Sequence, residues 1–438
     1  MVKKLSGEPL IVFNPKLPKL SKNEREVLRL LVEAGKLIVP IYKLQENPKF
    51  PGANFYPHDA SKEEIQKAAK TDPGILSHYT VVERIEGKLV ATAYHIKYAD
   101  LLRPIAEILN EASQICENKE FSRFLKIQSK ALLEGSYEEA VIASLKKKPY
   151  ILDIFIGSMD HDDDQLLFTK ASFQAWVGVM DKEGTERLNN YKSIILSARK
   201  IPVPTERVDN YDKVKAKVLD VVVFSGLLAK TKFVGINLPS NISIVEKFGS
   251  EITLFNQPND LRMKEQIMPT FEKIFPREFR QGFDSEDLRR GSLRYIAMHE
   301  LSHSYLYYRR AEKNLQDLFM PIYELAATVL GFRMAGILLL KDRINNKQLE
   351  SMIVAFLCRS FYLAEQSRVN KLMVNYTLGG IIFINFLLES GALKQLKGIA
   401  IPNFMKVFIA LHDLFRILEH LLASGTRQEA ADFIKKYG

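Results

Sequence analysis

Cysteine, histidine and tryptophan are scarce in this chain. Its 438 residues include two Cys, eight His and one Trp. Cys116 and Cys358 are far apart and belong to no CxxC pair, so the sequence indicates neither a disulfide framework nor a thiolate metal site. This pattern is typical of a protein from a reducing compartment.

Long hydrophobic runs are also missing. The longest apolar stretches, residues 334–340 and 377–388, fall short of the roughly 18 residues that would span a bilayer. We therefore expect buried core helices there, no transmembrane segment and no membrane partner. Near the N-terminus, the apolar run at residues 9–13 is too short for the core of a signal peptide, and prolines follow it. Together these features predict a cytoplasmic protein.

The chain has an excess of basic residues, with 62 Lys and Arg against 52 Asp and Glu, and a formal net charge of +10. A basic surface can bind nucleic acid. Here the basic residues are scattered, and the sequence contains no zinc-finger spacing, RNP motif or basic groove interleaved with aromatic residues. We interpret the charge as a lysine-rich solvated surface and expect no nucleic-acid partner. The sequence carries no signal for an oligomeric state.

The hydrophobic periodicity predicts an α+β protein of two lobes. Residues 79–96 alternate around Glu86-Gly87, which is typical of a β-hairpin. Three-and-four spacing of apolar residues predicts helices at 99–135 and 173–201, and almost throughout from about residue 260. Further strands are expected at 150–161, 218–226 and 232–241. The resulting division is a mixed α/β lobe (1–165), joining helices (166–205), a β segment returning to the mixed lobe (206–258) and a helical lobe (259–438).

Residues 299–303 read HELSH within a predicted helix. In a chain with so few histidines, an HExxH motif is expected by chance on the order of once in a hundred chains. Residues i and i+4 lie on one helix face, so His299 and His303 can bind one cation. Glu300 is turned by about 100° from His299 and can reach a metal-bound water without being a ligand. The motif predicts a zinc hydrolase with Glu300 as general base. The alternative is a polar pair on a solvated helix face.

A catalytic zinc site normally has a third protein ligand. The best candidate is Glu324, which precedes the small, apolar run LAATVL in a second predicted helix. Alternatively, this carboxylate is paired with a buried Arg or Lys, or is favoured by the helix dipole after Pro321. We predict that His299, His303 and Glu324 bind one zinc ion.

With these residues, the segments IFIGSMDHDDD (154–164), GINLPSN (235–241) and YELAATVLGF (323–332) complete a pattern. The chain resembles the dipeptidyl peptidase III (M49) family of zinc metallopeptidases, particularly its shorter bacterial members, over most of residues 55–395. The resemblance implies a helical zinc-binding lobe and a mixed lobe separated by a wide cleft. It also implies removal of N-terminal dipeptides from short peptides that bind as an added strand. Asn237, Pro239 and Ser240 would then contact the substrate.

The chain departs from the family at several positions. It has HExxH where the best-known members have HExxGH. Ser240 replaces a second Asn, Phe155 replaces a tyrosine, and Tyr323 replaces an acid beside the zinc glutamate. Tyr376 lies near the position of a histidine that assists the transition state. Its phenol could donate a hydrogen bond to an oxyanion, or it could be a core aromatic residue.

Two further groups of residues have two interpretations each. Arg359 and Arg368, on one predicted helix, could bind a substrate carboxylate or form structural ion pairs. The acidic run at residues 160–164 could bind a cation or form the loop after a strand.

The function predicted from the sequence is that of a zinc metallopeptidase acting on short oligopeptides. The departures leave open a catalytically weak, zinc-containing module for peptide binding or regulation. A zinc hydrolase of a non-standard amide is a second alternative.

Overall fold

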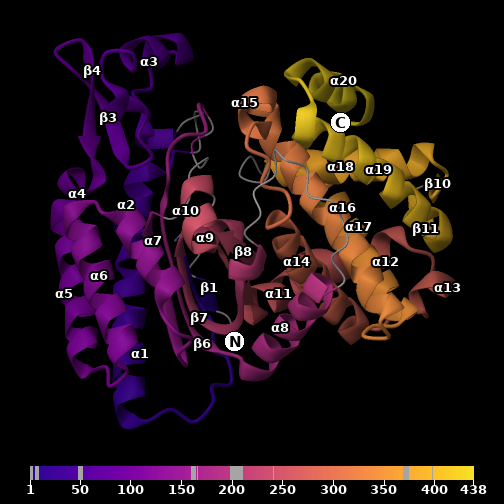
Figure 1. Ribbon diagram of the computed structural model, residues 1–438, viewed down its shortest axis with the longest axis horizontal. Helices are drawn as coiled ribbons and strands as arrows, with labels where there is room; N and C mark the ends of the chain where they lie inside the picture. The colour runs from indigo at the N-terminus through magenta and orange to yellow at the C-terminus, as the bar shows by residue number, and fades with distance from the viewer. Residues whose placement is uncertain are drawn as a thin grey trace. The chain divides into compact units, whose positions relative to one another are not determined.

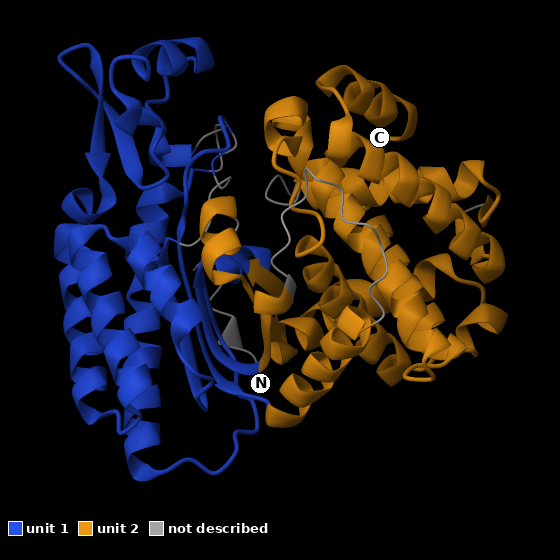
Figure 2. Ribbon diagram, viewed as in Figure 1, with its two compact units in different colours: residues 1–181, 219–232, 238–240 blue, residues 182–218, 233–237, 241–438 orange. Residues whose placement is uncertain are grey.

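The computed structural model describes residues 3–4, 9–47, 53–158, 164, 166–197, 211–239, 241–367, 374–396 and 398–438 (Figure 1). Two compact units are apparent in Figure 2. Unit 1 comprises Met1–Asp181, Leu219–Lys232 and Leu238–Ser240, and unit 2 comprises Lys182–Val218, Phe233–Asn237 and Asn241–Gly438. The chain therefore passes between the units more than once. These units give the α+β architecture that the sequence predicts.

Unit 1 contains an antiparallel sheet with the strand order β1-β2-β7-β6-β5. Its strands are β1 (Lys3–Lys4), β2 (Leu10–Val12), β5 (Leu152–Ser158), β6 (Phe173–Met180) and the second part of β7 (Lys215–Gly226). Every residue of β5 is buried, and so is every residue of β6 except the last. Burial on both faces explains why these strands are continuous apolar runs that lack the alternation of a half-exposed strand.

The predicted helix at residues 173–201 was wrong at its start. Residues 173–180 form β6, which pairs with β5 on one side and β7 on the other. A short apolar run fits a central strand as well as a buried helix, so its periodicity does not separate the two. The helical part of this stretch is α8 (Lys182–Ser197), in unit 2.

Helices and a small hairpin complete unit 1. The predicted hairpin is confirmed as β3 (Thr80–Ile85) and β4 (Lys88–Ala93), and both residues of its turn, Glu86 and Gly87, have positive φ, as tight hairpin turns require. The helices are α1 (Lys22–Lys36), α2 (Ile38–Gln45), α3 (Lys62–Ala68), α4 (Tyr94–Lys97), α5 (Ala99–Ile115), α6 (Lys119–Glu134), α7 (Tyr137–Lys146) and α9 (Leu227–Thr231), with single 3-10 turns at Ala53–Phe55 and Pro73–Leu76.

Unit 2 is mainly helical, as predicted for the C-terminal half. After α8 its helices are α10 (Ile242–Phe248), α11 (Asn256–Arg262), α12 (Met268–Ile274), α13 (Arg277–Arg280), α14 (Ser285–His303), α15 (Ala311–Leu315), α16 (Phe319–Leu340), α17 (Asn346–Gln366), α18 (Val374–Glu389), α19 (Phe404–Ser424) and α20 (Arg427–Tyr437). A π-helical turn at Met263–Ile267 joins α11 to α12, and 3-10 turns lie at Tyr211–Lys213 and Gln316–Leu318. The strands are β8 (Gly235–Leu238), β9 (Glu251–Phe255), β10 (Leu393–Leu396) and β11 (Ile399–Pro402).

Helix α16 is the central element of unit 2. It packs against α14, α17, α18 and α19, and its residues 324–332 are all buried. By length and composition alone, the stretch Ala311–Leu340 could cross a membrane, but 72% of its apolar window is buried inside the structure. That burial is the pattern of a core helix.

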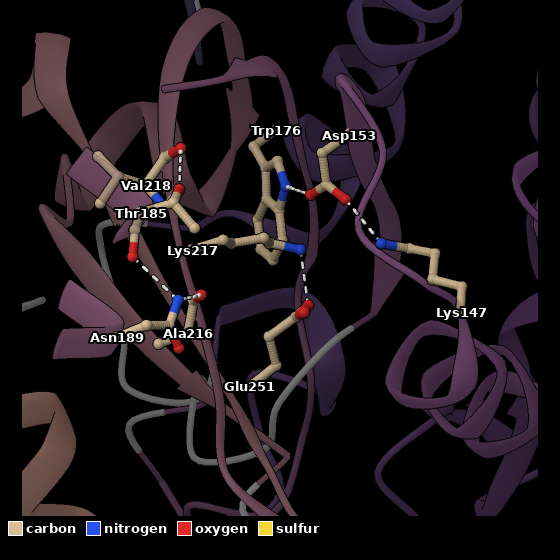
Figure 3. A network of polar contacts seen from close by, with 9 residues as sticks. All are labelled: Lys147, Asp153, Trp176, Thr185, Asn189, Ala216, Lys217, Val218 and Glu251. Atoms are coloured by element: carbon tan, nitrogen blue, oxygen red, sulfur yellow. Dashed lines mark hydrogen bonds and ion pairs between the residues drawn. The ribbon is translucent and has the colours of Figure 1, made fainter. Parts of the chain in front are cut away.

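Buried polar contacts stabilise each unit internally (Figure 3). In unit 1, the Asp153 carboxylate accepts hydrogen bonds from Lys147 Nζ at 2.8 Å and Trp176 Nε1 at 2.9 Å. In unit 2, Lys217 Nζ pairs with Glu251 at 2.6 Å. Because each of these buried charges has a partner of opposite charge, they are compatible with a stable interior.

Candidate metal centre

Helix α14 positions the HExxH residues. It begins at a capping box formed by Asp284 and Asp287 and ends at His303, so the motif occupies the last turn. His299, Glu300 and His303 are each less than one-tenth exposed. The histidine pair therefore does not lie on a solvated helix face.

Glu324, on α16, faces the two histidines. Its Oε2 lies 3.2 Å from His299 Nε2 and 3.8 Å from His303 Nε2, and the two Nε2 atoms are 3.2 Å apart. In a tetrahedral zinc site with bonds of about 2.05 Å, neighbouring ligand atoms lie about 3.3 Å apart. These three side chains therefore fit the ligand set of one zinc ion.

Close packing of α14 on α16 makes this convergence possible. A Cβ atom on Gly331 would lie 2.9 Å from the backbone nitrogen of His299 and from the carbonyl carbon of Met298. Real side chains do not tolerate such distances, so a glycine lets the two helices approach each other at the level of the first histidine.

Glu300 is the second carboxylate at the site. One ligand atom from each of His299, Glu300 and His303 falls within a span of 4.8 Å. Both glutamates are therefore near the histidines, and two arrangements of ligands are possible by distance alone. Glu324 Oε2 lies within 4.0 Å of both Nε2 atoms.

Thr328 orients the first histidine, and our sequence analysis missed it. The Thr328 hydroxyl donates to the Glu324 carbonyl at 3.2 Å and lies 2.9 Å from His299 Nδ1. With its proton directed to that carbonyl, the hydroxyl accepts a hydrogen bond from Nδ1–H. His299 Nε2 then has a free lone pair, as a metal ligand requires. The available signal was the spacing: Thr328 follows Glu324 by four residues and so shares its helix face.

Burial shapes the electrostatics of the centre. Desolvation lowers the pKa of His299 to about 3, with a further contribution from Arg262, and lowers that of His303 to about 4. Both imidazoles are therefore neutral at pH 7, which is the form that binds metal. Burial, reinforced by Glu324, raises the pKa of Glu300, and the charge of Arg262 opposes this rise.

Strand β8 holds the end of α14. The carbonyl of Glu300 lies among the last four of the helix, which lack helical partners, and it accepts a hydrogen bond from Asn237 Nδ2 at 2.9 Å. Asn237 Oδ1 is buried without a hydrogen-bond partner among the described residues. Gly235 lies so close to α14 that an added Cβ would be 2.9 Å from Glu300 Cγ. Strand β8 therefore packs closely against α14 at the HExxH motif and is hydrogen-bonded to it.

A cavity of about 60 Å³ opens beside His299 within unit 2. Its lining includes His299, Glu300, Glu324, Arg262, Arg359 and Tyr376. The Tyr376 ring packs near Phe233, with ring centroids 5.9 Å apart. The structure thus brings Tyr376 to the same cavity as Glu300.

The structural neighbours of this chain include two dipeptidyl peptidase III structures. The solved dipeptidyl peptidase III structures from Caldithrix abyssi and Corallococcus sp. strain EGB match with TM-scores of 0.80 and 0.82. They cover 95% and 97% of this chain, and the matches span 90% of each neighbour, at identities of 21% and 19%. This chain has the dipeptidyl peptidase III fold.

Sequence comparisons are less specific than the fold. No family model matches the chain. Nudix hydrolase 3 of Arabidopsis thaliana is 24% identical over 430 residues, covering 89% of this chain. The match covers 54% of the plant protein, so the chain spans about half the length of this curated relative.

Two of the departures from the dipeptidyl peptidase III pattern have clear packing roles. Phe155 is buried in unit 1 against Trp176, with ring centroids 5.2 Å apart. Tyr323 packs its ring on that of His303, with centroids 4.7 Å apart. An aromatic contact therefore supports His303 where the family pattern predicts an acid beside Glu324.

The structure describes only some of the remaining predicted residues. Pro239 is buried and follows a cis peptide bond. Ser240 and Arg368 lie outside the described residues, as do residues 160–163 of the acidic run. The last member of that run, Asp164, is buried and accepts hydrogen bonds from the backbone N–H groups of residues 166–170. Its carboxylate thus organises a loop.

Proposed function

We propose that this protein is a zinc-dependent peptidase that cleaves short oligopeptides and releases N-terminal dipeptides. The observation that carries the proposal is the convergence of His299 Nε2, His303 Nε2 and Glu324 Oε2 at 3.2 to 3.8 Å. The dipeptidyl peptidase III fold supports it.

The donor set suits zinc. Two neutral imidazoles and one carboxylate are a common catalytic zinc site, and a bound zinc ion would supply Lewis acidity to water and to the scissile carbonyl. His299, His303 and Glu324 would hold it. Thr328 would keep His299 in the correct tautomer, and the Tyr323 ring would restrain His303.

Glu300 would act as general base and then as general acid. Its carboxylate would accept the proton of the attacking water and pass it to the leaving amine. Burial favours the protonated form of Glu300, whereas Arg262 and a bound cation favour the ionised form. These opposed influences fit a carboxylate that takes up and then releases a proton during the reaction.

Strand β8 and Tyr376 would position the peptide. The Nδ2 group of Asn237 is used on α14, so its buried Oδ1 is the atom that would accept a peptide N–H. Pro239 and Ser240 would extend this contact segment. The Tyr376 hydroxyl would donate a hydrogen bond to the developing oxyanion. We place the reaction in the cytoplasm, in keeping with the two buried free thiols of Cys116 and Cys358.

The test compares wild type with Glu300→Gln and a matched control, Glu286→Gln, which changes an exposed glutamate on the same helix. Each zinc-loaded protein is incubated with a mixed oligopeptide pool, and the products are identified by mass spectrometry. We expect wild type and Glu286→Gln to release N-terminal dipeptides. Glu300→Gln should bind one zinc ion and release none. Turnover by Glu300→Gln would refute the role of Glu300.

A second candidate function is peptide binding with little catalysis. It is favoured by the small volume of the cavity, about 60 Å³, and by the aromatic pair of Phe233 and Tyr376 in its wall. An unchanged peptide pool in the presence of a tightly bound zinc ion would support it, or would indicate a non-standard amide substrate.

A further inference from the structure

Two buried arginines share the wall of the cavity beside His299. Arg262 is the last residue of α11, and Arg359 lies in the middle of α17. Each is only 6% exposed, and both line the cavity together with His299 and Glu300. Buried arginines at a cavity wall need an explanation, because arginine is almost never fully buried without a charged partner.

Among the residues that the structure describes, neither guanidinium has an anionic partner. Arg262 Nη1 donates to the hydroxyl of Tyr295 at 3.2 Å, and Arg359 Nη1 donates to Gln266 Oε1. In the described part of the chain, no carboxylate lies within 4.0 Å of either group. A guanidinium has five N–H donors, so each arginine retains donors beyond this neutral hydrogen bond.

The two like charges also oppose each other. Burial and the charge of Arg262 lower the pKa of Arg359 to about 9, so Arg359 is still cationic at pH 7. Glu300 and Glu324 balance two positive charges at most. A divalent cation at the histidines would leave the pocket with an excess of positive charge. In a buried site such an excess is unfavourable unless an anion enters.

We infer that Arg262 and Arg359 form a carboxylate-binding subsite that selects peptides with a carboxylate on a residue flanking the scissile bond. This inference rests on the proposed peptidase function, because a subsite beside the scissile bond matters only if a peptide is cleaved there. Its volume would hold only a few water molecules, which matches a carboxylate with a short stem. Arginine is well suited to this ligand because its planar fork can donate two parallel hydrogen bonds. The carboxylate could belong to an acidic side chain or to the C-terminus of a very short peptide.

The ligand is tested with matched peptides that differ only in Glu or Gln at the second or third residue, each with a free or an amidated C-terminus. Binding is measured by calorimetry on the zinc-free wild type, where no turnover occurs. The value of kcat/KM is measured on the zinc-loaded protein. We expect a free carboxylate to strengthen binding by about 10- to 100-fold, the value of a charge-assisted hydrogen bond. A difference between the Glu and Gln peptides would identify a side chain as the source of the carboxylate. A difference between the free and amidated peptides would identify the C-terminus.

The residues are tested with Arg262→Gln and Arg359→Gln. Arg333→Gln is the matched control, since Arg333 is a partly buried arginine of the same unit that packs on Phe415. The first two variants should lose the preference for the carboxylate and should unfold at the same temperature as wild type or a higher one, because a buried like-charged pair is relieved. The control should keep the preference. A fall in unfolding temperature with an unchanged preference would show a structural role instead and overturn the inference.

The outcomes separate this inference from the proposed function. Turnover of peptides without any preference in binding or in kcat/KM would overturn the subsite and leave the peptidase intact. A preference in binding without turnover would support the subsite and count against the peptidase. Absence of both binding and turnover for every peptide would count against both.

Discussion

The Thr328 hydroxyl lies 2.9 Å from Nδ1 of His299, and both side chains are buried. The same hydroxyl donates a hydrogen bond to the backbone carbonyl of Glu324 at 3.2 Å. One hydroxyl therefore links the two helices that carry the candidate metal ligands, and it favours the tautomer of His299 that has its proton on Nδ1. The centre depends on α14 and α16 equally.

Thr328→Val should weaken zinc binding. Valine keeps the shape of the side chain but cannot hydrogen-bond His299 Nδ1, and loss of such an orienting contact typically costs about 10- to 100-fold in metal affinity. Zinc affinity is measured by competition with a chromogenic chelator. Thr328→Ser, which retains the hydroxyl, should restore most of the affinity. Equal affinities for all three proteins would show that the hydrogen bond has no orienting role.

Removal of zinc should lower the stability of unit 2. A ligand that binds only the folded state stabilises it by about 4 kcal/mol at a thousand times its dissociation constant. We expect the unfolding temperature to fall on chelation and to recover when zinc is returned. In Glu324→Gln the recovery should require much more zinc. A Glu324→Gln protein that matches wild type at every zinc concentration would rule out Glu324 as a ligand.

Gly235→Ala should impair catalysis. The added methyl would lie 2.5 Å from Ile296 Cγ2 and 2.9 Å from Glu300 Cγ, so β8 and α14 must separate. Overpacking of this kind costs about 1–3 kcal/mol, and the displaced Glu300 should lower kcat. The control is Gly336→Ala on α16, where an added Cβ meets nothing within 4 Å. That variant should be fully active and slightly more stable. Full activity of Gly235→Ala would contradict close contact between β8 and the motif.

Lys170 should make the stability of unit 1 depend on pH. Its ammonium group is fully buried and donates to three oxygens, those of the Ile75 and Ser77 carbonyls and the Thr80 hydroxyl. Desolvation nevertheless lowers its pKa from 10.5 to about 7. Between these two values the unfolded chain binds more protons than the folded one, so stability should rise with pH over this interval.

The comparison is with Lys170→Met, which removes the titrating group. Free energies of unfolding are measured by denaturant titration from pH 6 to pH 10. The difference between wild type and variant should shift in favour of wild type as the pH rises. A constant difference would mean that Lys170 has the same pKa in both states.

The sequence predicts those features of the structure that are determined by residues close together in the chain. The HExxH helix and the hairpin at Glu86-Gly87 are fixed by residues within a few positions of each other, and both were predicted. β6 was not, because a strand buried on both faces has no alternation to distinguish it from a helix. Thr328 was within reach, since the i+4 position after Glu324 is a local relation.

The arginine pair could not be located from the sequence. Arg262 and Arg359 belong to helices far apart in the chain, and only the packing of α17 on the turn after α11 brings them to one cavity. The sequence-based hypothesis grouped Arg359 with Arg368 as candidate carboxylate-binding residues, and did not include Arg262. The spacing of residues along the sequence does not predict a pocket that is built from distant segments.

The π-helical turn at Met263–Ile267 has a consequence for how this pocket can change in evolution. A π turn holds one residue more than the α-helical path needs, and here that extra residue lies between Arg262 and the helix that continues as α12. Loss of a single codon in this segment would restore a regular helix and rotate Arg262 by about 100° relative to α12. Gln266, which holds Arg359, lies within the same turn. One deletion could therefore change the positions of both arginines in the pocket without replacing either of them.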